Sequence, residues 1–324
     1  MNPGKLICKI AFIAGILSGH LEADAQKTNT DTTWWPSVWG PDDQRGALNR
    51  LGSQNVLTAS RLIKEGKIYQ LGREYEPGMP LPDNRTYSLS IPVRPTRGPS
   101  GSNQVVYNVE TINANMCQIG TQFDGLGHVG MRINGIDRYY NGFEGSKILL
   151  PAGLLKLGVE NVGAIFTRGV LLDIAGYKGT DPLAPGYVIT VKDVEGTLNK
   201  EKIEIREGDV VLIYTGHGNL WKTDQKAFNG NQPGIGMEVA RMLNDKKIVM
   251  VGADNSAIEA LPSEDTTKSI PCHQWLLARN GIYLFENLDL KGLADDKVYE
   301  FAFSYAPIKF KGGTGSPGNP IAIR

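Results

Sequence analysis

The sequence predicts an α/β fold, a single domain with a mixed β-sheet and flanking helices. In the second half of the chain, apolar β-branched runs alternate with helix-like segments, the pattern of a sheet covered by helices. The chain has 324 residues, 41% hydrophobic and 21% charged, enough to form a sizeable core. No internal repeat or low-complexity linker divides the sequence, so one domain is expected.

The elements are expected in the following order. Residues 26–53 form an irregular N-terminal segment whose indole rings pack on the body, residues 55–64 a helix, and residues 67–75 a strand. Six prolines between residues 76 and 104 predict a long irregular loop, a kind of segment that often forms a lid. Further strands are expected at 164–174, 209–214, 248–252, 282–286 and 298–306, and helices at 236–244 and 271–279.

The first 25 residues have the pattern of a secretory signal peptide, which leaves residues 26–324 as the domain. Lys5 and Lys9 lead into an apolar run, and Ala23 and Ala25 stand before Gln26 as small residues do at a cleavage site. The apolar run is too short to anchor the chain in a bilayer. The sequence therefore predicts a periplasmic or secreted protein.

The charge of the chain limits its partners, and its cysteine content limits its disulfides. The 34 basic and 34 acidic side chains cancel, so nothing electrostatic favours binding to nucleic acid or to an anionic membrane. We expect a small-molecule substrate instead, and a homo-oligomer, most simply a dimer. Without the signal peptide two cysteines remain, Cys117 and Cys272, which allow either one disulfide or two buried thiols.

One glycine-rich segment carries the densest group of polar side chains. Gln118, Gln122, Asp124 and His128 fall within eleven residues, and three glycines allow the backbone to bring them together. A carboxylate, an imidazole and two amide oxygens can hold a divalent cation or a polar substrate. The simpler alternative is a tight turn whose polar side chains bond to the backbone.

Other candidates lie later in the chain and at its start. His273 begins a helix and Glu286 ends a strand, two positions that can meet at one rim of an α/β sheet. A lone histidine is more often a surface residue, but a carboxylate after four apolar strand residues requires partners. Trp39 and His217 are candidates for substrate binding, although simple packing is the commoner role for the tryptophan cluster.

These segments together resemble the putative cyclase family, which includes bacterial kynurenine formamidase and isatin hydrolase. The family hallmark is His-x-Gly-Thr-His-x-Asp-x-Pro-x-His. The same frame here reads Gln118-x-Gly120-Thr121-Gln122-x-Asp124-x-Leu126-x-His128. The later family pattern His-x-x-Leu-Leu and Glu-Asn-Leu matches residues 273–277 and 286–288, and the resemblance covers about residues 35–324.

The resemblance implies a barrel-like core of the kynurenine formamidase type and a metal-dependent hydrolase of amide or cyclic amide bonds. Carried over from the family, Gln118, Gln122 and Asp124 take the metal positions, for Mn or Zn. His128, His273 and Glu286 take the catalytic positions. Two family imidazoles are thus replaced by amides, which are weaker ligands for Zn.

The resulting hypothesis is an exported hydrolase of a small amide, lactam, lactone or ester. It would use a divalent metal and a His/Glu acid–base set. The alternative is a non-catalytic periplasmic protein that binds small molecules on the same fold. The exchange of both metal histidines for glutamine favours this alternative, whereas the retention of Asp124, His128, His273 and Glu286 opposes it.

Overall fold

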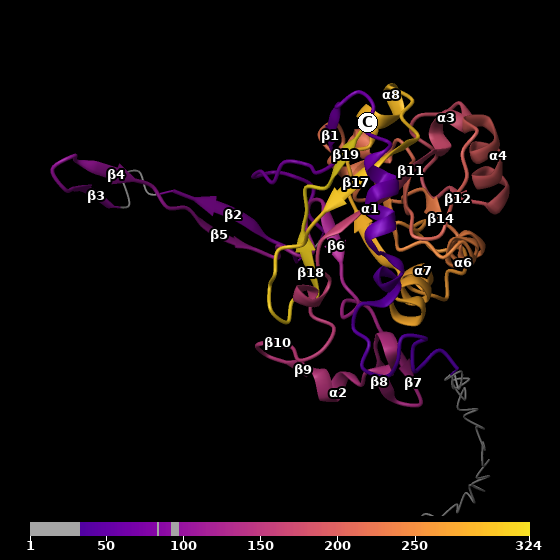
Figure 1. The fold of residues 1–324 in the computed structure, drawn as a ribbon, viewed down its shortest axis with the longest axis horizontal. Coiled ribbons are helices and arrows are strands. Elements are labelled where there is room, and N and C mark those ends of the chain that lie inside the picture. The colour runs from indigo at the N-terminus through magenta and orange to yellow at the C-terminus, as the bar shows by residue number, and fades with distance from the viewer. Residues whose placement is uncertain (1–32, 83, 92–96) are drawn as a thin grey trace, which may run out of the picture.

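The structure is a computed structural model, and it describes residues 33–82, 84–91 and 97–324. The predicted signal peptide lies outside the described residues. Within them, a curled nine-stranded sheet forms the centre of the molecule (Figure 1). This confirms the predicted α/β domain with a mixed, barrel-like sheet.

The strands of the large sheet follow the order β1-β19-β17-β11-β13-β15-β16-β6-β18. Strands β11, β13, β15 and β16 are parallel to one another, and all other neighbours are antiparallel. Their bounds are β1 Ile68–Gln70, β6 Gln122–Asp124, β11 Ile165–Asp173, β13 Val210–Tyr214, β15 Met250–Ala253, β16 Tyr283–Glu286, β17 Glu300–Tyr305, β18 Gly315–Pro317 and β19 Ile321–Ile323.

The helices lie around this sheet (Figure 1). They are α1 Ser53–Ser60, α2 Gly145–Ile148, α3 Ile174–Lys178, α4 Val191–Glu201, α5 Gln225–Phe228, α6 Met237–Asp245, α7 Pro271–His273 and α8 Lys291–Asp295. Helix α7 continues as a π-helix over Gln274–Arg279, and short 3-10 turns occur at Gly46–Arg50, Tyr140–Gly142, Val159–Asn161 and His217–Leu220. The sequence did not point to α4, although Thr190 and Asp193 cap its first turn reciprocally.

The central strands confirm the sequence prediction most closely. All five residues of β13 and all four of β15 are buried, as in a parallel sheet whose two faces are both covered. Such strands appear in the sequence as continuous apolar runs, which is why they were recognisable. No helix in the described part of the chain is long and apolar enough to cross a membrane.

The predicted irregular loop at 76–104 is wrong in its second part. Strand β2 (Tyr87–Ser90) pairs with β5 (Thr111–Ala114), and β3 (Arg97–Ser100) pairs with β4 (Val105–Tyr107). Figure 1 shows these strands projecting from the body, and we call residues 87–114 the hairpin arm. Each strand of a two-stranded ribbon keeps one unpaired edge, so Pro99 is tolerated on β3 despite its missing N–H.

Smaller features complete the chain. Three short hairpins or strand pairs join β7 (Met131–Ile133) to β8 (Ile136–Arg138), β9 (Leu149–Leu150) to β10 (Gly153–Leu154), and β12 (Val188–Ile189) to β14 (Gly234–Ile235). Cys117 and Cys272 are both free thiols; Cys272 is buried, as expected for two buried thiols, whereas Cys117 is only partly buried. The Arg138 guanidinium lies over the Trp35 ring, 5.4 Å from its centroid, so this indole packs on the body as expected.

Candidate active site

The alternation of side chains on two paired strands creates the site. Gln122 on β6 stands opposite Glu286 on β16, and Asp124 lies two residues along β6. Because strand side chains alternate between faces, these three polar groups share one face of the sheet. The intervening Phe123 faces the other way and stacks on Tyr283, with 5.1 Å between ring centroids, which holds the two strands together from the core side.

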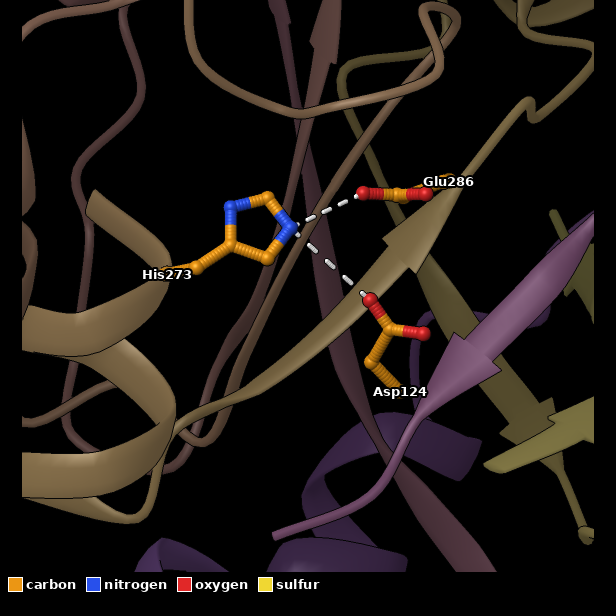
Figure 2. Close-up of side chains that lie close together, drawn as sticks. All are labelled: Asp124, His273 and Glu286. Carbon is orange, nitrogen blue, oxygen red and sulfur yellow. Dashed lines mark hydrogen bonds and ion pairs between the residues drawn. The ribbon is translucent and has the colours of Figure 1, made fainter. Parts of the chain in front are cut away.

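His273 completes a compact group with Asp124 and Glu286. Figure 2 shows the imidazole, which comes from α7, pointing toward the two strand-borne carboxylates. Its Nε2 atom lies 3.1 Å from Glu286 Oε1 and 3.9 Å from Asp124 Oδ2. All three side chains are buried, and one ligand atom from each lies within 4.8 Å of the others. This spacing is suited to a single cation.

Glu259 positions His273 through hydrogen bonds to its ring nitrogen Nδ1 and to the backbone. Its Oε1 lies 2.7 Å from His273 Nδ1 and accepts the His273 backbone N–H at 3.0 Å, while its Oε2 accepts the Cys272 N–H at 3.1 Å. A carboxylate at Nδ1 keeps the proton there and leaves Nε2 directed into the site. Glu259 was not predicted, although a carboxylate within the apolar run Ala-Ile-Glu-Ala-Leu was a recognisable signal.

The two glutamines contact the carboxylates through their amide nitrogens. Gln122 Nε2 donates to Glu286 Oε2, and Gln118 Nε2 donates to Asp124 Oδ1 at 3.1 Å. Gln118 Nε2 also lies 3.3 Å from His128 Nδ1. The structure thus brings Gln118, Gln122, Asp124 and His128 together as expected. Metal ligation by either glutamine stays a prediction.

Several observations show that the donor set fits a divalent cation. Asp124 Oδ2 and Gln122 Oε1 are buried without a hydrogen-bond partner, a costly arrangement unless another group binds them. Three buried carboxylates, those of Asp124, Glu259 and Glu286, surround the single imidazole of His273. Carboxylate oxygens and an imidazole together suit Mn or Zn.

The same excess of negative charge shifts the pKa values of the site. Burial by itself lowers the pKa of His273, but its hydrogen bonds to Glu259 and Glu286 outweigh burial and raise the pKa to about 10. Burial, followed by the charge of Asp124, raises the pKa of Glu286 to about 7. The negative charge of the buried carboxylates can therefore be neutralised either by a proton on His273 or by a cation bound between them.

A cavity of about 260 Å³ opens onto this group. Gln118, Gln122, His128, His273 and Glu286 line it on the polar side. The rest of the lining was not predicted and includes Arg85, Trp221, Phe228, Asn229 and Asn287. The cavity therefore combines a buried anionic end with an aromatic wall, and it has the size of a small-molecule site.

Arg85 is a cation at this cavity that the sequence did not reveal. Its Nη1 donates to the Gln118 carbonyl and lies 3.3 Å from Gln118 Oε1. Both acceptors are neutral, so in the described part of the chain its charge is not matched by a carboxylate. The remaining N–H groups of the guanidinium are available to a ligand.

The two predicted substrate-binding residues lie elsewhere. Trp39 packs under the Arg50 guanidinium, 5.0 Å from its ring centroid, and is not among the residues that line the cavity. His217 is buried behind Phe228, and its Nε2 lies 2.9 Å from the Phe228 carbonyl. Burial lowers the pKa of His217. These contacts explain both residues through packing, and a substrate role for them stays a prediction.

Comparison with known proteins agrees with this fold and site. The model of the family described as Cyclase (Putative cyclase) matches residues 37–260. A crystal structure of a novel cyclase is 32% identical, with a TM-score of 0.79 over 88% of this chain and 96% of that one. No curated protein sequence matches significantly. The chain belongs to the cyclase family.

More distant structures share the fold. Isatin hydrolase A from Labrenzia aggregata, solved with benzyl benzoate, is 21% identical with a TM-score of 0.57 over 84% of this chain and 98% of that one. Isatin hydrolase A from Ralstonia solanacearum is 18% identical with a TM-score of 0.55 over 80% and 92%. These likenesses show that the fold is shared, and in this chain that fold brings Asp124, His273 and Glu286 together as a possible site for a metal ion.

Proposed function

We propose that this protein hydrolyses a small amide, lactam, lactone or ester in the cavity beside Asp124, His273 and Glu286. One observation carries the proposal: three buried carboxylates converge on one imidazole and leave Asp124 Oδ2 without a hydrogen-bond partner. A protein that only bound small molecules would gain little from so costly a cluster of buried charge. The isatin hydrolases named above share the fold.

Asp124, His273 and Glu286 are the residues that would hold the cation. When bound, a divalent cation supplies Lewis-acid polarisation of the scissile carbonyl. Glu259 orients His273 through Nδ1, and Gln122 fixes one oxygen of Glu286. Mn or Zn suits this mixed oxygen and nitrogen set.

His128 is the residue placed to move protons. Its side chain is 24% exposed and lines the cavity, and its Nε2 lies 4.0 Å from Asp124 Oδ2. Gln118 meets the other ring nitrogen and restrains the ring. His128 can therefore accept a proton from an attacking water and return it to the leaving group.

Arg85 supports a substrate or product that carries a carboxylate. Opening a lactam, lactone or ester releases a carboxylate, and the free donors of Arg85 at the cavity can receive it. The aromatic side chains of Trp221 and Phe228 offer an apolar wall for the remainder of the molecule.

The test is turnover of a panel of small amides, lactams, lactones and esters with added Mn or Zn. We expect Asp124→Asn to lose on the order of 10²-fold or more in turnover, as for loss of a metal ligand. The matched control is Asp137→Asn, at an exposed ion pair with Arg132, which should keep full activity. Saturable binding without turnover of any panel member would instead favour the non-catalytic alternative.

Export is a separate proposal that rests on the N-terminal sequence. The basic start, the apolar run and Ala23-x-Ala25 support cleavage before Gln26 and a periplasmic or secreted location. Mass spectrometry of protein from its native host should find a chain that begins near Gln26. Soluble protein with an intact Met1 would contradict export.

A further inference from the structure

A second cavity lies next to the segment that carries His273. Its volume is about 440 Å³, compared with about 260 Å³ for the catalytic cavity, and it forms between α6 and the π-helix over Gln274–Arg279. Figure 1 shows α6 and α7 on the side of the body away from the hairpin arm. Glu259 and Cys272 border this second cavity, whereas His273 borders the catalytic one. The two cavities are therefore separated by the residues that orient His273.

The wall between the two cavities has an unusual backbone. Ile258 (φ 59°) and Ile270 (φ 40°) are both in the left-handed region, which β-branched residues rarely adopt. The chain then continues from α7 into a π-helix, a rare form that occurs often at functional sites. Such conformations persist only where surrounding contacts hold them, and they are frequent at ligand clamps and switch regions. The position of this wall therefore depends on what packs against it.

The second cavity offers hydrogen-bond donors that have no acceptor in the described part of the chain. Arg241 stacks on the Trp275 ring, 4.7 Å from its centroid, and forms no ion pair with a described carboxylate. The Trp275 Nε1–H is buried without a hydrogen-bond partner. Ser263 is 8% exposed, and no described residue bonds its hydroxyl group. A guanidinium, an indole N–H and a hydroxyl without acceptors are suited to an anionic ligand with acceptor oxygens.

The acidic side chains at this cavity already have partners. Each of the three carboxylates that border it takes part in a hydrogen bond or an ion pair: Glu259 with His273, Glu264 with the Met237 N–H, and Asp265 with Lys268. The positive charge of Arg241 is therefore available to a ligand.

Much of the remaining lining is apolar. It consists of Met131, Ile235, Met237, Ala260 and Trp275. Met237 Sδ lies 3.7 Å from Cys272 Sγ, so polarisable sulfur atoms border the space. Methionine sulfur and the indole ring both pack favourably on aromatic groups. The lining thus fits a molecule with an aromatic ring and one carboxylate, and the volume is that of a small-molecule site.

We propose that the second cavity binds a small aromatic carboxylate and that this ligand tightens cation binding at the catalytic group. The carboxylate bonds to the Arg241 guanidinium, and the ring lies against Trp275 and the methionines. The ligand contacts the wall that contains Glu259, and Glu259 orients His273. The negative charge of the ligand also favours a cation nearby. The effect on the cation rests on the proposed function, whereas the binding of the carboxylate does not.

The first test is calorimetric titration of the purified protein, without added metal, with benzoate and with benzamide as a neutral probe of similar shape. We expect the wild type to bind benzoate with a dissociation constant of about 1 mM or lower. Arg241→Met should weaken benzoate binding roughly tenfold to a hundredfold and leave benzamide binding unchanged, because it removes a hydrogen bond to a charged group. Arg241→Lys, which keeps the charge, should recover part of the affinity. The matched control, Arg61→Met, changes an exposed arginine at the end of α1 and should bind benzoate as the wild type does.

Titration of Arg85→Met in parallel distinguishes the two cavities, because Arg85 lines the catalytic one. Loss of benzoate binding in Arg241→Met supports the second cavity. Loss in Arg85→Met alone would place benzoate in the catalytic cavity and overturn the proposal. Equal loss of benzoate and benzamide binding in Arg241→Met, or the absence of any benzoate binding that depends on Arg241, would also overturn it.

The second test measures Mn affinity with and without saturating benzoate. We expect benzoate to tighten Mn binding about fivefold or more, and Mn to tighten benzoate binding by the same factor, since such coupling is reciprocal. Arg241→Met should abolish the effect. Unchanged Mn affinity with benzoate bound would overturn the coupling. A protein that binds no Mn at all would contradict the proposed cation site and this coupling with it, whereas benzoate binding that depends on Arg241 would still support the second site.

Discussion

Replacing Glu259 by glutamine should weaken cation binding and catalysis in addition to destabilising the fold. The carboxylate is 1% exposed and accepts hydrogen bonds from His273 Nδ1 and from two backbone N–H groups at the start of α7. Glutamine keeps one acceptor oxygen but removes the charge, and its amide nitrogen faces a backbone donor. His273 then loses the anion that directs Nε2 toward Asp124 and Glu286.

The hydrogen bonds of Glu259 set the expected losses of cation affinity, turnover and stability. A hydrogen bond to a charged group contributes about 1.5–3 kcal/mol, which corresponds to roughly a tenfold to hundredfold loss of cation affinity and of kcat/KM. One backbone N–H left without its acceptor costs about 1–3 kcal/mol of stability. Titration with Mn or Zn measures cation affinity, and turnover on the substrate panel measures kcat/KM. Urea unfolding measures stability separately.

A matched control is available five residues further along the chain. Glu264 Oε2 accepts the backbone N–H of Met237 at 2.9 Å, so it also bonds to the start of a helix, but it is exposed and contacts no residue of the site. Glu264→Gln should leave cation affinity and turnover unchanged. If Glu259→Gln lowers stability while cation affinity and turnover stay at the wild-type level, Glu259 only caps α7 and its role at His273 is refuted.

Three further predictions follow from other contacts. Changing Gln118 and Gln122 together to histidine should raise the Zn retained after dialysis by more than about tenfold, because imidazole is the better Zn ligand; unchanged Zn would mean that neither position faces the cation. Arg85→Met should weaken inhibition by small carboxylates roughly tenfold to a hundredfold and spare neutral inhibitors of the same shape, and equal loss for both would remove its role in carboxylate binding. Burial raises the pKa of Glu201 from 4.5 to about 8, so wild-type stability should fall as pH rises through this window. In urea unfolding, Glu201→Gln should therefore gain about 1–2 kcal/mol relative to wild type between pH 5 and pH 9, after allowance for solvent screening, and a difference that does not change with pH would contradict this assignment.

The sequence by itself determined the features that depend on local pattern. The buried strands at 210–214 and 250–253 appear as apolar runs because both faces of the parallel sheet are covered. The motif from Gln118 to His128 is compact in sequence, so its members were bound to lie close together. The later His273 and Glu286 could meet one another at a rim of the sheet, but the family resemblance was needed to join them to this motif.

Tertiary structure decided the rest, because the deciding contacts join residues far apart in the chain. Gln122 and Glu286 become neighbours only through the register of β6 and β16, and no local pattern states which strands pair. Glu259 reaches His273 only because the chain after β15 turns back toward α7. The hairpin arm escaped prediction for the same reason: its prolines and glycines are typical of loops, and its strands are stabilised by partners across the ribbon that sequence neighbours do not reveal.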